Sequence, residues 1–185
     1  LATEIAVIQL LTLLLGHPVY AVTSLLAVML VCSGAGSMWS DRVVHAKAWV
    51  PSAVLAVLIT TVGLGLLPAV HASQGAGLLT RLVLGVIVLV PLAVVMGMPF
   101  PLGLKTLVTD DSRHVGWGWA ANGFASVIAA PLAALLALEA GSSVVLVTAA
   151  LLYGIAAFIS VSTRASREAR TIRPPAQSTT APRRT

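Results

Sequence analysis

The chain has 185 residues, of which 58% are hydrophobic and only 9% charged, and its mean hydropathy is +0.98. Soluble domains have about 25% charged residues, so this composition excludes an ordinary water-soluble fold and favours a bilayer as solvent. The net charge of +5 comes from residues 164–185, where six arginines outnumber one glutamate, and the other residues sum to zero. Such a basic tail is typical of a membrane protein touching anionic lipid headgroups, and we expect no nucleic-acid partner.

The predicted elements are apolar helices separated by short segments that contain Gly, Pro or charge. A spanning helix needs roughly 20 apolar residues. Five runs reach this length, and the run that opens the chain is shorter and looks truncated at its start. We therefore predict an all-α, polytopic transmembrane helix bundle of about six spans. The spans are residues 1–15, 18–38, 49–69, 78–98, 117–138 and 143–163.

The chain then divides into a six-helix transmembrane module, residues 1–163, and a basic tail, residues 164–185. Arginines at helical spacing predict that the last helix can extend to about Arg173. After Pro174 and Pro175 the composition predicts a disordered cytoplasmic tail.

Basic residues and tryptophans predict the orientation of the bundle. With six spans, ten of the eleven basic residues lie on one side, and only Arg81 lies on the other. The positive-inside rule makes the basic side cytoplasmic. We therefore expect a protein of the bacterial inner (cell) membrane with both termini on the cytoplasmic side. The four tryptophans fall at the same boundary, as in an aromatic belt. They are Trp39, Trp49, Trp117 and Trp119.

The fifth span has an alanine at every fourth residue, which is typical of a helix that another helix approaches closely. Asn122 and Ser126 lie one turn apart beside this stripe and could hydrogen-bond across the contact, or could line a polar substrate path. The stripe consists of Ala121, Ala125, Ala129, Ala133 and Ala137.

Few other residues are candidates for chemistry. Glu4 and Gln9 lie in the first span, and an acid at membrane depth is a candidate for substrate binding. His17 precedes Pro18 at a turn, where we expect an interfacial histidine rather than a metal ligand, because no second His or Cys stands at ligand spacing. Gly34 and Gly36 indicate close helix packing. Pro99 and Pro101 are expected to end the fourth span and to prevent a regular helix there.

Two family resemblances suggest functions. Asp41-Arg42, after Gly36, is loosely similar to the loop motif of major facilitator transporters, although Ser37 replaces the expected glycine and Val44-His45 the later Gly-Arg pair. Half of such a carrier has six spans with both ends on the cytoplasmic side. This alternative would place Glu4 and Gln9, with Asn122 and Ser126, around a midplane site.

The second resemblance covers most of residues 1–163. The blocks that carry it resemble the C-terminal membrane region of bacterial membrane-fused spermidine synthase-like proteins, with Lys105 where arginine is usual. The blocks are Ile8–Tyr20, Ser33–Ser37, Met96–Lys105 and Trp117–Val127.

The second resemblance implies a membrane module joined to an upstream soluble aminopropyltransferase-like domain. No catalytic residue of that domain can be assigned to a residue of this chain. We therefore expect no cofactor and no catalysis in this chain. The module is then an anchor, an exporter of product or a binder of a lipid-soluble substrate. A purely structural module packing through the alanine stripe is the remaining alternative.

Overall fold

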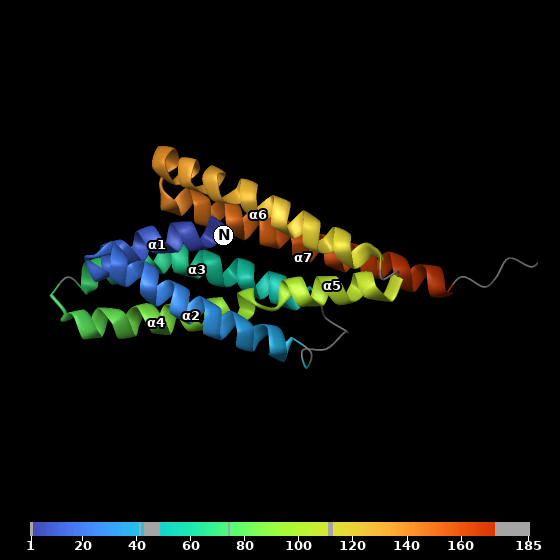
Figure 1. Ribbon diagram of the computed structural model, residues 1–185, viewed down its shortest axis with the longest axis horizontal. Coiled ribbons are helices and arrows are strands. Elements are labelled where there is room, and N and C mark those ends of the chain that lie inside the picture. The colour runs from blue at the N-terminus through green and yellow to red at the C-terminus, as the bar shows by residue number, and fades with distance from the viewer. Residues whose placement is uncertain (1, 41, 43–48, 74, 111–112, 173–185) are drawn as a thin grey trace, which may run out of the picture.

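A computed structural model describes residues 2–40, 42, 49–73, 75–110 and 113–172 (Figure 1). Every regular element in these ranges is an α-helix. Figure 1 shows the helices running roughly along one direction, as in a bundle. They are α1 (Ala2–Leu15), α2 (Pro18–Trp39), α3 (Val50–Ala72), α4 (Leu78–Met96), α5 (Pro99–Asp110), α6 (Arg113–Ala140) and α7 (Ser142–Ile172).

Within the described residues, four stretches are long and apolar enough to cross a membrane, and two shorter apolar helices, Ala2–Leu15 and Val50–Gly65, accompany them. The all-α prediction is confirmed, and the long apolar helices indicate a membrane protein. The four stretches are Pro18–Trp39, Leu78–Lys105, Val115–Ala140 and Ser142–Thr163; the second continues from α4 into α5.

The segment around Pro99 and Pro101 differs from the prediction. Helix α4 ends at Met96 as expected, and Gly97 caps it by donating its N–H to the carbonyl of Ala93. The chain does not stay irregular, however, because α5 begins at Pro99. The first turn of a helix has no intrahelical partners for its N–H groups, so prolines are tolerated there. The two prolines therefore start a helix instead of preventing one.

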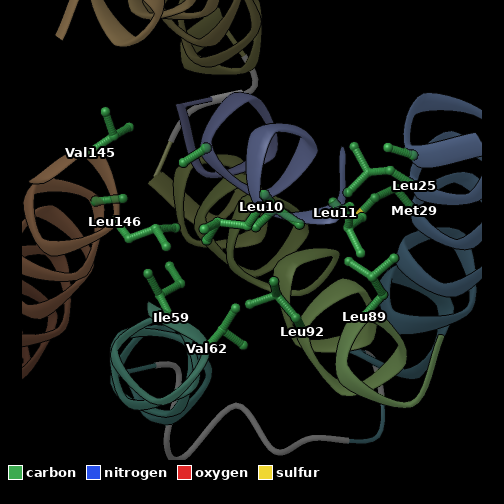
Figure 2. Close-up of a cluster of buried hydrophobic side chains, with 14 of the residues drawn as sticks. Leu10, Leu11, Leu25, Met29, Ile59, Val62, Leu89, Leu92, Val145 and Leu146 are labelled. Carbon is green, nitrogen blue, oxygen red and sulfur yellow. The ribbon is translucent and has the colours of Figure 1, made fainter. Parts of the chain in front are cut away.

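Helix α1 lies at the centre of the bundle. It packs against α2, α3, α4, α6 and α7. Half of its residues are buried, and Leu11 and Leu14 are among the largest fully buried side chains. Figure 2 shows Leu10 and Leu11 in the middle of the cluster, between Leu25 and Met29 of α2 and residues of α3, α4 and α7.

Helices α2 and α4 touch backbone to backbone at two points. A Cβ added to Gly36 would lie 1.9 Å from the carbonyl oxygen of Val94, and one added to Gly97 would lie 2.0 Å from that of Ser33. Only glycine allows the two backbones to approach so closely. Lipid provides no hydrophobic drive for helix association, so helices in a bilayer associate through such close contacts between small residues. The predicted close packing is confirmed for Gly36, whereas the space around Gly34 is open.

Arg81 joins three helix ends. Its Nε donates to the carbonyl oxygens of Ser73 and Ala76, both at 3.1 Å, and its Nη1 donates to that of Leu14 at 3.4 Å. Ser73 and Ala76 follow the end of α3, and Leu14 lies in the last turn of α1. The last carbonyls of a helix have no intrahelical donors. The one basic residue outside the predicted cytoplasmic cluster thus satisfies backbone groups at its end of the bundle.

The opposite end holds the tryptophans, since Trp39 ends α2, Trp49 precedes α3, and Trp117 and Trp119 lie near the start of α6. Helix α7 also runs toward this end and continues into the basic segment as far as Ile172 (Figure 1). No Gly or Pro interrupts the sequence between Gly154 and Pro174. Residues 173–185, where disorder is predicted, lie outside the described residues.

Candidate functional site: a cavity between the helices

A cavity of about 750 Å³ lies where helices from both halves of the chain meet. Binding pockets for small molecules have volumes of about 300–1,000 Å³, so this one is large enough for a ligand. It is lined from α1 by Glu4; from α2 by Leu25, Leu26, Met29, Leu30, Ser33, Gly34 and Ser37; from α4, α5 and the turn between them by Met96, Gly97, Pro99, Phe100 and Pro101; from α6 by Asn122; and from α7 by Tyr153.

Glu4 lines this cavity from the first turn of α1 and is half-buried. Among the other lining residues, Leu25 and Met29 lie in the middle of α2 and Tyr153 lies well inside α7, whereas Ser37, Met96 and Pro99 lie at or near helix ends. In Figure 1, α1 likewise begins part-way along the bundle. A charge in the centre of a spanning helix costs about 3 kcal/mol on insertion scales. A cavity whose lining includes polar side chains is an environment in which such a group is retained.

Asn122 and Ser126, predicted as a pair, have different surroundings. Asn122 lines the cavity, although it is exposed in the chain as a whole, so the cavity is accessible along α6. Ser126, one turn further on, is half-buried and is not among the lining residues.

Gln9 has a structural partner elsewhere. Its Oε1 accepts a hydrogen bond from the hydroxyl of Ser142 at the start of α7. It thereby links α1 to α7 and does not line the cavity. Interhelical hydrogen bonds of this kind hold apolar helices together in lipid.

His17 caps α2. Its Nδ1 accepts a hydrogen bond from the N–H of Val19 at 3.3 Å, and its ring lies against that of Tyr20, with centroids 5.7 Å apart. Among the described residues, no group of three or more His, Cys, Asp or Glu side chains could hold a metal.

The alanine stripe of α6 is buried along only part of its length. Ala133 and Ala137 are buried, Ala129 is half-buried, and Ala121 and Ala125 are exposed. Close approach of another helix within this chain is therefore limited to the second half of the stripe.

Several lining residues were not singled out from the sequence. Tyr153 is a hydroxyl-bearing residue in mid-span, and that position was a usable signal. Ser33 and Ser37 bracket the glycines of α2, and the hydroxyl of Ser33 donates to the carbonyl of Met29. Phe100 packs edge-to-face on Trp119, with ring centroids 4.8 Å apart, and so holds α5 against α6. Only the fold reveals that these residues share a cavity.

Comparison of the chain with known protein families, with curated proteins and with solved structures finds no match.

Proposed function

We propose that this chain is an integral membrane module that is not itself catalytic and binds a small molecule within the bilayer, as a transport-related protein does. The cavity is the observation that supports this proposal. It brings Glu4, Asn122 and Tyr153 together from the beginning, the later part and the end of the chain. Polar groups at membrane depth usually line substrate or ion pathways.

The resemblance to the membrane region of spermidine synthase-like proteins adds a second line of support. Three of its blocks supply cavity residues: Ser33–Ser37, Met96–Lys105 and Trp117–Val127. Three of the four blocks that carry the resemblance thus contribute to one cavity, and Ile8–Tyr20 does not. We propose on this basis that the module is fused to an upstream aminopropyltransferase-like domain and takes up or releases a small molecule connected with it.

The alternative, half of a major facilitator-like carrier, is favoured by the shared position of Glu4 and Asn122. It also expected Gln9 and Ser126 in the site, and neither lines the cavity. The full reading frame discriminates between the two: a Gly-rich, acid-containing Rossmann region before this chain supports the first proposal, and a second set of six spans supports the alternative.

Cysteine accessibility tests the proposed binding cavity. In a Cys32→Ala background, Ser37→Cys and Asn122→Cys should react with the neutral water-soluble reagent 2-hydroxyethyl methanethiosulfonate, because a thiol must be hydrated to ionise and react. Val31→Cys and Val127→Cys are matched controls on the same helices; they are exposed on the apolar surface and should react at least about tenfold more slowly. Equal rates in the two pairs would overturn the proposal of a hydrated cavity.

The proposed orientation, with both termini on the cytoplasmic side of the inner membrane, rests on the positive-inside rule. An impermeant maleimide applied to intact cells should label Gly75→Cys, next to Arg81's end of the bundle, and should spare Gly116→Cys at the start of α6. The opposite pattern would reverse the orientation.

A further inference from the structure

We infer that helix α5 is a gate of the cavity, which pivots at the break after α4 and is held against α6 by the contact of Phe100 with Trp119. This inference rests on the proposed function, because a gate matters only where a small molecule enters the cavity. It adds to that function a moving element and the two side chains that hold it.

The break between α4 and α5 lacks two of the hydrogen bonds that would make the two helices one. In an uninterrupted helix, the N–H groups of residues 99 and 101 would donate to the carbonyls of Val95 and Gly97. Both positions are proline, which has no N–H, so neither bond can form. The carbonyl of Val95 instead accepts from the N–H of Met98 at 3.1 Å, in a tighter turn. The backbone therefore permits a change of angle between α4 and α5 at this point.

The end of α4 is fixed on α2, whereas α5 is held less firmly. A Cβ added to Gly97 would lie 2.0 Å from the carbonyl oxygen of Ser33, so the two backbones are in direct contact. Helix α5 packs mainly against α6. Its one buried side chain among those described, Leu102, lies outside the main hydrophobic core cluster, and no described side chain of α5 packs against that cluster. A fixed helix joined through a weak point to a loosely held one is the arrangement of a hinge.

Phe100 connects α5 to α6 at the edge of the cavity. It lines the cavity, and its ring meets that of Trp119 edge-to-face, with centroids 4.8 Å apart. Trp119 lies one turn before Asn122 on α6, and Asn122 lines the cavity whereas Trp119 does not. The aromatic pair therefore spans the gap between α5 and α6 one turn from a lining residue. A single pair of this kind is a weak contact, so α5 can separate from α6 at little cost.

Matched tryptophan substitutions test the gate in the full protein in nanodiscs. Ser33→Cys, in the Cys32→Ala background, places a thiol in the lining, and its reaction with neutral 2-hydroxyethyl methanethiosulfonate reports access to the cavity. Trp119→Leu should speed this reaction about three- to tenfold, because it removes the contact with Phe100 and leaves the lining intact. Trp117→Leu, two residues earlier where the side chain is 76% exposed, should leave the rate unchanged.

Two further measurements separate a moving helix from a missing side chain. Phe100→Leu should speed the reaction by a similar factor, and combining it with Trp119→Leu should add little, since both changes remove the same contact. Hydrogen exchange reports the pivot itself. The amides of residues 100–105 in α5 should exchange faster in Trp119→Leu than in the parent, and those of residues 85–93 in α4 should not.

The outcomes distinguish the gate from the cavity. Equal rates in Trp119→Leu and Trp117→Leu would overturn the gate and leave the cavity proposal standing. A faster reaction without faster exchange in α5 would mean that the lost side chain admits the reagent and that the helix does not pivot, which also overturns the gate. A thiol at residue 33 that reacts in none of the variants would contradict the cavity itself, and the gate with it.

Discussion

Helices α1 and α6 are both apolar, yet they occupy opposite environments. The 14-residue α1 lies at the centre of the bundle, whereas the 28-residue α6 lies along one side (Figure 1). Seven α1 residues are buried, against two in α6, Ala133 and Ala137. Neither helix has a strong polar face, because lipid is as apolar as the protein interior. Hydropathy therefore identifies helices that enter a membrane and leaves open which of them lies inside the bundle.

The largest expected effect comes from truncating matched leucines on the two helices. Leu11→Ala removes a side chain that is 1% exposed from the centre of the core, and should lower the unfolding free energy by about 2–5 kcal/mol. Leu138→Ala on α6, where the side chain is 78% exposed, should change it by less than about 0.5 kcal/mol. Reversible unfolding in mixed micelles with increasing sodium dodecyl sulfate measures both. Equal losses would contradict the central position of α1.

A smaller effect is expected at the α2–α4 crossing. Gly36→Ala places a methyl group against the carbonyl of Val94, a backbone atom that no side-chain rotation can move away. We expect a loss of about 1–3 kcal/mol through overpacking. Gly34→Ala, on the same helix with open space around its Cα, should be neutral or slightly stabilising in the same unfolding assay. If both variants lost the same stability, the loss would not be specific to the close crossing, and the contact of Gly36 with the Val94 carbonyl would not explain it.

The alanine stripe of α6 sharpens the comparison within one helix. Ala133→Leu adds bulk at a buried contact and should cost about 1–2 kcal/mol. Ala125→Leu, two turns earlier, should be silent because that residue is exposed in this chain. Thermal unfolding in detergent compares the two variants. A loss at Ala125 as large as that at Ala133 would mean that another helix, outside this chain, covers the first half of the stripe.

The cavity shows how far residue types alone predict a site. Glu4 and Asn122 were recognised as polar residues in apolar spans, and both line the cavity. Gln9 and Ser126 were recognised by the same criterion and do not line it, and neither does His17, which was predicted at an interfacial turn; Gln9 instead bonds Ser142, and His17 caps α2. A polar side chain in lipid must find partners, and a neighbouring helix or its own backbone satisfies it as well as a ligand does. The pattern therefore predicts that such a residue is buried among partners, without specifying which ones.

The sequence by itself determined the all-helical class, most helix ends and the grouping of basic and tryptophan residues at one end. These features follow from local chemistry, namely the length of the apolar runs, the Gly and Pro residues that end helices, and the positions of the charges. The tertiary structure alone decided that the short helix α1 is central, that Pro99 begins a helix and that Gly36, rather than Gly34, sits at the α2–α4 crossing. It also decided which polar residues share a cavity. In a uniformly apolar chain no hydrophobic face marks the inside, so the partners of each helix depend on the fit of small residues and on interhelical hydrogen bonds, and both are properties of pairs of helices.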